Sequence, residues 1–235
     1  MNRRAWSGFA AAALLLGSSG SLGAQGAVVP SDQRDILEAA GQSRTKGEAG
    51  APLRIVEISD FECPFCAQYY RETYPVVDSL YVESGIARYV WISFPNSRHR
   101  RAWPAIEAAF CAGAAGRFWE MHDILFETRE EWTEAEDPHA RFVDYAGRAG
   151  VEPESFEACL RNDQTAPLQV SDYESALRSG ITSTPFFIVG DSLANTTLGY
   201  DSTLPLESDA MRAAVRAVSR GVSRGLLVAD MPFGS

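Results

Sequence analysis

The segment IVEISDFECPFC, residues 55–66, decides the fold of this chain of 235 residues. Residues 53–61 (LRIVEISDF) are rich in β-branched and apolar side chains and predict a strand. The Cys-Pro-Phe-Cys motif follows directly, and residues 67–82 favour a helix. Pro64 suits the first turn of that helix, because the amide hydrogen that proline lacks would have no partner there. Pro75 predicts a kink or a break in its later part.

On the C-terminal side of this helix, Gly85 marks its end, and residues 86–94 (IARYVWISF) predict a second strand. A strand–helix–strand unit of this kind implies a right-handed crossover and parallel pairing. Ser31 and Asp32 precede a short apolar pattern that predicts a capped helix ahead of the first strand.

From residue 96 to about residue 180 the apolar residues recur at helical spacing, which predicts a helical insertion packed against one side of the sheet. The expected helices cover residues 102–115, 117–128, 139–149, 153–160 and 164–179. The sheet is expected to resume at 185–189 (PFFIV), with a turn at Gly190-Asp191, an antiparallel partner at 192–198 and a last helix at 206–220.

The N-terminus has the pattern of an export signal. Arg3 and Arg4 are followed by the short apolar run 8–17 (GFAAAALLLG) and a small-residue segment that ends near residue 26, with cleavage expected after Ala24 or Gly26. The apolar run is about half of the ~20 residues that a membrane-spanning helix needs, although an uncleaved N-terminal anchor stays as an alternative. We therefore expect an exported protein.

The net charge of −10 argues against binding to nucleic acid or to an anionic membrane surface. One short basic cluster, at residues 98–101, is expected to be a solvated loop or helix start, and we leave its His99 out of the predicted site. Outside the reducing cytosol, the four cysteines of the chain are expected to form disulfides.

A strand that ends in Cys-x-x-Cys at the start of a helix favours thiol–disulfide exchange. The helix dipole and unpaired amides stabilise the thiolate of Cys63, which we expect to be the exposed, attacking sulfur. Cys66 lies one turn on, close enough to form a disulfide, and is expected to be the protected, resolving sulfur. The alternatives are a purely structural disulfide and half of a zinc site, for which the scattered histidines offer no paired spacing.

Glu57 stands among apolar neighbours in the first strand, where an ionisable residue is unusual. A carboxyl group buried beneath the cysteines would have a raised pKa and could exchange protons with Cys66. The alternative is an edge-strand glutamate that faces water, paired with Arg54.

The segment STPFF, residues 183–187, places Pro185 at the start of a strand, where it cannot donate a ladder hydrogen bond. A cis-proline loop here would cover the disulfide and expose the Thr184 backbone to an extended substrate chain. A trans proline that simply opens the strand is the alternative.

Together, IVEISDFECPFC, the long helical insertion and STPFFIVG (residues 183–190) resemble the thioredoxin superfamily, and more narrowly the DsbA-like thiol–disulfide oxidoreductases of the bacterial periplasm. The resemblance covers roughly residues 50–220. It implies an α/β thioredoxin-like fold with a helical domain inserted before the cis-proline strand. The implied divisions are a signal at 1–26, a lead-in at 27–50, the thioredoxin-like domain at 51–95 and 181–222, the insertion at 96–180, and a loose tail at 223–235.

The same resemblance implies the roles of individual residues. Cys63 would be the nucleophile, Cys66 the resolving cysteine and Glu57 the buried carboxylate. Thr184 and Pro185 would face the substrate, as would Pro64 and Phe65 between the cysteines. Cys111 and Cys159 resemble the pair that forms a second, structural disulfide in the insertion of some members; the alternative is two buried free thiols.

Two departures from the best-known oxidases of the family bear on the direction of exchange. Phe65 replaces a histidine between the cysteines and offers no imidazolium to Cys63, so the disulfide should be less strongly oxidising. Thr184 replaces a valine and is shared with related isomerases and reductases. The short lead-in leaves no room for the N-terminal dimerisation domain of such isomerases, which argues against an isomerase. We expect a monomeric oxidase, with a reductase as the alternative.

The predicted function is thus a periplasmic protein disulfide oxidase that needs no metal or organic cofactor beyond its Cys63–Cys66 disulfide. Its expected partners are exported proteins with cysteine thiols and a membrane or periplasmic redox partner. The competing hypotheses are a reductase or isomerase kept reduced by a membrane donor, and a non-enzymatic binding or chaperone module with a structural disulfide. Peroxide detoxification is a weaker rival.

Overall fold

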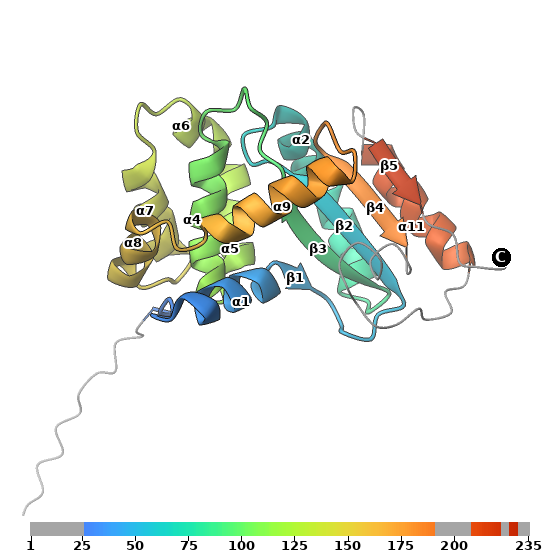
Figure 1. Ribbon diagram of the computed structural model, residues 1–235. Helices are drawn as coiled ribbons and strands as arrows, with labels where there is room; N and C mark the ends of the chain where they lie inside the picture. Colours follow the sequence, from blue (N-terminus) through green and yellow to red (C-terminus); the bar gives the residue numbers. More distant parts are fainter. Residues whose placement is uncertain (1–25, 191–207, 222–225, 230–235) are drawn as a thin grey trace, which may run out of the picture.

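The computed structural model describes residues 26–190, 208–221 and 226–229. The predicted export signal and the predicted strand at 192–198 lie outside these residues, apart from Gly26. Figure 1 shows a twisted sheet on one side of the molecule and a group of helices on the other. In the described part of the chain, no helix is both long and apolar enough to cross a membrane.

The sheet has five strands in the order β1-β3-β2-β4-β5. Its two central strands, β2 (Leu53–Ser59) and β3 (Ala87–Ser93), pair in parallel, which confirms the predicted parallel pairing. On the other side of β2 lies β4 (Phe186–Gly190), in the antiparallel direction. The edges are the two-residue β1 (Thr45–Lys46), antiparallel to β3, and β5 (Leu226–Ala229), parallel to β4.

The connection from β2 to β3 begins with α2 (Pro64–Glu72), in which Pro64 occupies the first turn as expected. The predicted break is present: α2 ends ahead of Pro75, and the chain continues as α3 (Tyr74–Val77) and the π-helical turn η1 (Asp78–Val82). Gly85 then reverses the chain with φ +75°, a value that glycine adopts without steric cost.

The lead-in forms α1 (Gln33–Ser43), and the side chain of Asp32 caps it by accepting hydrogen bonds from the amides of Arg34 and Asp35. After β3 the chain is helical until shortly before β4. These helices are α4 (Ala102–Ala114), α5 (Phe118–Glu127), α6 (Arg129–Thr133), α7 (His139–Arg148), α8 (Pro153–Arg161) and α9 (Ala166–Arg178). The sequence did not predict the short α6. The last helix is α11 (Ser208–Gly221).

The alternation of side chains along the strands divides the sheet into two buried faces. Ile55, Tyr89 and Phe187 share one face with Tyr69 of α2 and Val218 of α11. The other face packs against α9, which crosses it diagonally in Figure 1, through a second cluster of buried residues. That cluster consists of Val56, Ile58, Val90, Ile92, Phe94, Ala176 and Ile181.

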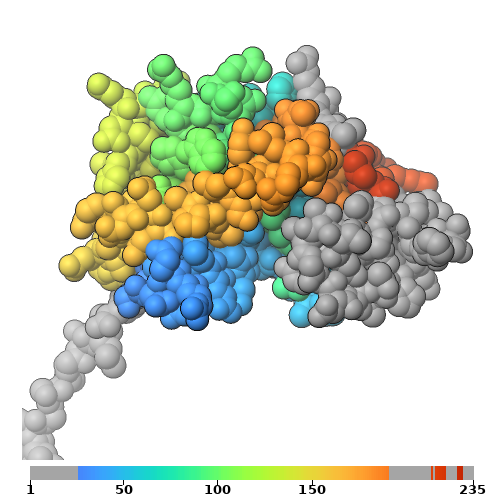
Figure 2. All heavy atoms as spheres, viewed as in Figure 1, coloured from blue at the N-terminus to red at the C-terminus, as the bar shows by residue number. Residues whose placement is uncertain are grey.

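The sequence analysis expected the helical insertion to pack against one side of the sheet, and this expectation is wrong. Helix α9 covers one face, whereas Trp119 of α5 contacts Tyr89 on the opposite face, with 6.0 Å between the ring centroids. Helices of the insertion thus cover both faces of the sheet near β3. Figure 2 shows α1 and α9 side by side on the same surface of the molecule.

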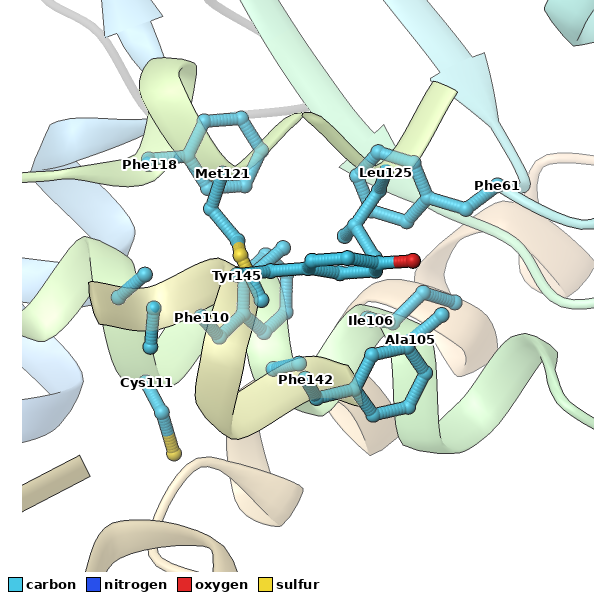
Figure 3. Packing of buried hydrophobic residues seen from close by; sticks show 14 of the residues in the cluster. Phe61, Ala105, Ile106, Phe110, Cys111, Phe118, Met121, Leu125, Phe142 and Tyr145 are labelled. Atoms are coloured by element: carbon cyan, nitrogen blue, oxygen red, sulfur yellow. The ribbon is translucent and has the colours of Figure 1, made fainter. Parts of the chain in front are cut away.

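Buried aromatic and alanine side chains form the core of the insertion and join it to the sheet (Figure 3). Phe61, directly after β2, stacks on Trp91 of β3 with 4.6 Å between the ring centroids. Trp91 in turn contacts Phe110 of α4 and Phe118 of α5. The end of β2, where the Cys-Pro-Phe-Cys motif begins, is therefore anchored in both parts of the molecule.

The expected loose tail at 223–235 is wrong for Leu226–Ala229, which form β5. All four residues pair in register with β4, from Phe186 opposite Leu226 to Val189 opposite Ala229. The short apolar run Leu-Leu-Val-Ala supplies the pairing strand.

Candidate functional site

The two cysteines of the motif lie where β2 gives way to α2. Cys63 occupies the N-cap position of α2 and Cys66 lies in its first turn; both are free thiols in this structure. Cys66 is fully buried, as expected for a protected sulfur. Cys63 is only 4% exposed, so the expectation of a freely exposed attacking sulfur is wrong.

The loop before β4 covers part of the Cys63 side chain. The Cys63 thiol donates a hydrogen bond to the carbonyl oxygen of Thr184, with 3.6 Å between Sγ and O. The bond between Thr184 and Pro185 is cis, and both residues are buried. The fold therefore brings the predicted substrate-facing loop against the motif across 121 positions of sequence.

The two sulfurs have opposite electrostatic environments. The hydrogen bond from the Cys66 thiol, together with Thr184 and the backbone amides of Phe65 and Cys66, lowers the pKa of Cys63 to about 6, although burial opposes this change. Burial raises the pKa of Cys66 well above its ordinary value, and the neighbouring Cys63 and Glu57 raise it further. Near neutral pH, Cys63 is thus a thiolate while Cys66 keeps its proton.

Glu57 lies in the middle of β2 and is 2% exposed. Because β2 is the central strand, with Trp91 of β3 and Phe187 of β4 as register partners of Glu57, the alternative of a water-facing edge glutamate is wrong. Burial raises the pKa of Glu57 above its ordinary value. Its charge is close enough to Cys66 to raise the pKa of that thiol, which is the placement that the proton-relay hypothesis needs.

Three residues around Glu57 were not predicted from the sequence. The Tyr89 hydroxyl donates a hydrogen bond of 2.6 Å to the Glu57 carboxylate, and the Tyr69 hydroxyl lies 3.2 Å from that of Tyr89. His122 of α5, which is 1% exposed, partly offsets the effect of burial on the pKa of Glu57. Period-two alternation could have placed Tyr89 on a buried face of its strand, but not beside Glu57.

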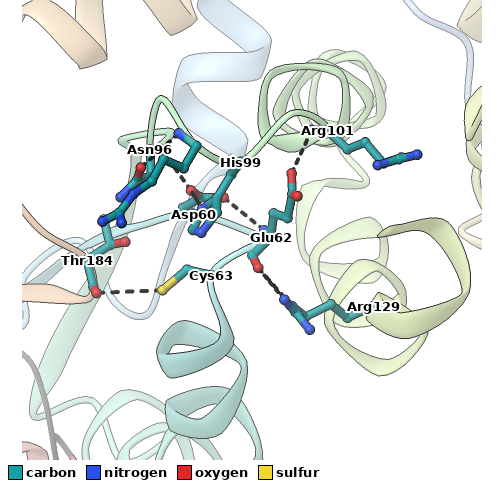
Figure 4. A network of polar contacts seen from close by, with 9 residues as sticks. Asp60, Glu62, Cys63, Asn96, His99, Arg101, Arg129 and Thr184 are labelled. Carbon is teal, nitrogen blue, oxygen red and sulfur yellow. Dashed lines mark hydrogen bonds and ion pairs between the residues drawn. The ribbon is translucent and has the colours of Figure 1, made fainter. Parts of the chain in front are cut away.

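A polar network holds the segment between β2 and the motif (Figure 4). The fully buried Asp60 accepts hydrogen bonds from the backbone amides of Glu62 (2.8 Å) and Asn96 (2.9 Å). It also contacts Nδ1 of His99 at 2.6 Å. The parallel strands β2 and β3 end at the same edge of the sheet, so the residues that follow them meet there. This rule could have pointed to His99, which the sequence analysis left out.

Two arginines complete the network on the side of the insertion. The guanidinium of Arg129 in α6 donates two hydrogen bonds to the backbone carbonyl of Glu62, at 3.0 and 2.5 Å. The Glu62 carboxylate accepts a hydrogen bond of 2.6 Å from the backbone amide of Arg101. The loop that carries Cys63 is therefore fixed by partners from the connection between β3 and α4 and from α6.

The other predicted site residues lie around the motif. Pro64 is exposed at the first position of α2, and Phe65 is 36% exposed. Phe61 and Phe187, which also lie near the cysteines, are fully buried core residues. Phe65 is thus an exposed aromatic side chain between the two cysteines.

Cys111 of α4 and Cys159 of α8 form a disulfide with a Cα–Cα distance of 5.9 Å, as the resemblance implied. Both residues are buried in the insertion, so this disulfide is a crosslink between helices. Among the described residues, no group of three or more His, Cys, Asp or Glu side chains is placed to hold a metal ion.

Comparison with known proteins shows the family to which this chain belongs. A family model described as thioredoxin matches residues 39–205. Among curated proteins, an Na(+)/H(+) antiporter, NhaA 3 of Salinispora tropica, is 34% identical over 149 residues, which are 63% of this chain and 22% of that protein. The chain spans about a fifth of the length of the antiporters that it matches.

Solved structures show the same fold at low sequence identity. The alpha-DsbA1 protein of Wolbachia pipientis has a TM-score of 0.59 and 18% identity, with 76% of this chain and 92% of that chain covered. Oxidised BdbD of Bacillus subtilis has a TM-score of 0.59 and 16% identity, with 85% of this chain and 100% of that chain covered. A thioredoxin-like oxidoreductase of Silicibacter pomeroyi has a TM-score of 0.53 and 19% identity, with 80% of this chain and 98% of that chain covered. This chain therefore belongs to the thioredoxin family, and its fold is that of the DsbA-like proteins.

Proposed function

We propose that this protein is a thiol–disulfide oxidoreductase that exchanges a Cys63–Cys66 disulfide with cysteines of substrate proteins. One observation carries the proposal: two cysteines in one helical turn have opposite pKa shifts, with the pKa of Cys63 lowered to about 6 and that of Cys66 raised. A structural disulfide gains nothing from this difference. Exchange requires it, because one sulfur must leave readily as a thiolate while the other takes up a proton.

In the oxidase direction, a substrate thiolate attacks Sγ of Cys63 in the disulfide form. The new bond joins the substrate to Cys63, the Cys63–Cys66 bond breaks, and its electron pair leaves with Cys66. Because burial raises the pKa of Cys66, the leaving sulfur needs a proton, which the protonated carboxyl of Glu57 supplies. Glu57 regains the proton from solvent.

A second substrate thiolate then attacks the substrate sulfur of the mixed disulfide. The substrate disulfide forms and Cys63 departs as a stable thiolate, so two electrons have passed from the substrate dithiol to the protein. A membrane or periplasmic redox partner must remove these electrons before the next cycle. The chemistry requires no metal or organic cofactor on this chain.

The oxidase direction is supported by the low pKa of Cys63, since a stable thiolate favours the reduced form of this protein and hence oxidation of the substrate. A periplasmic location is supported by the Cys111–Cys159 disulfide, which persists in oxidising compartments, and by the signal-like N-terminus. The substrates would then be exported proteins with cysteine thiols, acted on by a monomer.

Substrate contact is proposed at two places beside Cys63. The backbone of Thr184 lies against the reactive sulfur and could pair with an extended substrate segment. Pro64 and Phe65 form the exposed surface of the motif. A reductase or isomerase is the second candidate, because Phe65 places no cation between the cysteines and would leave the disulfide less oxidising.

Equilibration of the protein in glutathione buffers, followed by acid quenching and mass analysis, tests the proposal. Exchange of the Cys63–Cys66 pair with an oxidising potential, and a pair found oxidised by alkylation trapping in cells, would support the oxidase. A low potential with a reduced pair in cells would move the assignment to a reductase or isomerase. Absence of exchange would leave a structural disulfide and a non-enzymatic module.

Replacement of the resolving cysteine provides the matching covalent test. In Cys66→Ala the mixed disulfide between Cys63 and its substrate cannot be resolved from within the protein, so trapped complexes should accumulate. Cys63→Ala is the matched control and should trap none. Equal trapping by both variants would contradict the assignment of Cys63 as the nucleophile.

A further inference from the structure

The Cys-Pro-Phe-Cys motif places no charged side chain between its cysteines, yet an imidazole, which can carry a positive charge, approaches the motif from another part of the chain. His99 belongs to the loop between β3 and α4, and its ring lies against Asp60, three positions before Cys63 (Figure 4). The side chain of His99 is 22% exposed and that of Asp60 is fully buried.

Asp60 is bound tightly to the loop that carries Cys63. Its backbone carbonyl accepts a hydrogen bond from the Cys63 amide at 3.1 Å, and its carboxylate accepts one from the Glu62 amide at 2.8 Å. The same carboxylate accepts from the Asn96 amide and contacts His99 Nδ1. A buried carboxylate held at this position would oppose formation of a second negative charge on Cys63 unless a cation compensated for it.

His99 is suited to be that cation. The hydrogen bond with Asp60 raises the pKa of His99; burial opposes this effect, and the negative charges of Asp60, Cys63 and Glu62 add to it. A thiolate at Cys63 thus favours the imidazolium, and by the same physics an imidazolium held against Asp60 would favour the thiolate.

The arginine side chains around Cys63 are hydrogen-bonded elsewhere or exposed to solvent. The Arg129 guanidinium is engaged with the Glu62 carbonyl, and that of Arg101 donates to the carbonyl of Ala135. Arg98 and Arg100, on the same loop as His99, are exposed and therefore screened by solvent. On the opposite side of Cys63, Thr184 presents a carbonyl and a hydroxyl but no charge.

We propose that His99, oriented by Asp60, is the positioning residue that supplies the positive charge for the Cys63 thiolate, in place of a cation between the two cysteines. This inference rests on the proposed function for its consequence, the oxidising strength of the pair. The effect of His99 on the pKa of Cys63, however, concerns the reduced protein alone and can be measured without a substrate.

The test compares three single variants of the full chain. His99→Gln keeps a side-chain donor for Asp60 but removes the charge, whereas His99→Lys keeps a charge. His139→Gln removes an exposed histidine at the start of α7 and serves as the control. In the reduced protein, the Cys63 thiolate is titrated by its absorbance near 240 nm and by the pH dependence of alkylation, and thermal unfolding confirms that each variant is folded.

We expect His99→Gln to raise the pKa of Cys63 by about one unit, because a neighbouring opposite charge shifts a pKa by about 1–3 units. His99→Lys should keep most of the low value, and His139→Gln should not change it. The equilibrium with glutathione at pH 7 should shift about fivefold toward the oxidised protein in His99→Gln, as a change of thiolate pKa from about 6 to about 7 requires.

An unchanged pKa of Cys63 in His99→Gln would overturn the inference. Equal shifts in His99→Gln and His99→Lys would also overturn it, because they would show that His99 only anchors the loop. Failure of the proposed function is a separate result: the unsubstituted protein would then not exchange with glutathione, whatever the pKa values of the variants.

Discussion

At the scale of single residues, Cys63 and Cys66 show how position alone makes two identical side chains differ. Cys63 stands at the N-cap of α2, where backbone amides and the Cys66 thiol donate to its sulfur and lower its pKa. Cys66 lies one turn deeper, where burial raises its pKa. The sequence predicted this polarity because the start of a helix at Cys63, which favours its thiolate, is a local feature; the contributions of Thr184 and of burial depend on the whole fold.

Glu57→Gln should stabilise the folded protein at neutral pH. Burial raises the pKa of Glu57 in the folded state, so the folded state binds this proton more tightly than the unfolded state. Stability is therefore lost as pH rises from the unfolded value, near 4, through the folded pKa. We expect the variant to gain on the order of 1 kcal/mol in unfolding free energy at pH 8 and almost nothing at pH 4, by urea denaturation.

The exposed Glu136→Gln is the control for this prediction and should change stability little at either pH. A gain of equal size at pH 4 and pH 8 would show that the carboxylate charge is not the cause. A loss at pH 8 would mean that the ionised Glu57 stabilises the fold, contrary to its raised pKa.

The same variant should slow exchange. Without an acidic proton at position 57, Cys66 leaves the disulfide less readily, and a general acid of this kind contributes about 10²-fold or more. We expect stopped-flow opening of the disulfide by a small thiol to be at least tenfold slower in Glu57→Gln, with no matching change in Glu136→Gln. Equal rates would exclude Glu57 as the proton source.

Phe65→His should make the pair more oxidising. An imidazolium at position 65 would sit next to the Cys63 thiolate and lower its pKa further, which stabilises the reduced protein. The equilibrium with glutathione should shift several-fold toward the reduced form, whereas the control Phe65→Leu should leave it near the original value. A shift of the same size in both variants would attribute the effect to loss of the aromatic ring.

At the scale of the elements, the prediction succeeded where one segment carries its own pattern. The strands β2, β3 and β4, the break before Pro75 and the capped helix α1 all follow from local residues. The two-residue β1 was missed because Thr45 and Lys46 form a strand only through pairing with β3. In the same way, β5 is defined by its partner β4 and not by its four residues alone.

Loss of the disulfide between α4 and α8 should cost stability without removing exchange. The Cys111–Cys159 bond closes a loop with a sequence separation of 48, which corresponds to about 4 kcal/mol in the chain-entropy model. The double variant Cys111→Ala/Cys159→Ala should therefore unfold about 10 °C lower by calorimetry. Its glutathione equilibrium at Cys63–Cys66 should stay unchanged, and a changed equilibrium would show that the two disulfides are coupled.

At the scale of the whole molecule, the site is built from segments that meet only in the folded chain. The sequence predicted that Cys63, Cys66, Glu57 and the Thr184–Pro185 loop belong together, because each stands in a recognisable motif. It could not predict the contacts of Asp60 with His99, or of Glu57 with Tyr89, since these depend on strand register and on the path of the loop after β3. Such contacts carry no local pattern.

The central claim is that the fold makes Cys63 a thiolate near neutral pH while Cys66 keeps its proton. The most direct measurement is the pH dependence of alkylation of the reduced protein, with the modified cysteine identified by peptide mapping. A single reactive sulfur at Cys63, with a midpoint near pH 6 and Cys66 unmodified, is the predicted result. Reaction of Cys63 only above about pH 8, as for an ordinary thiol, would contradict it.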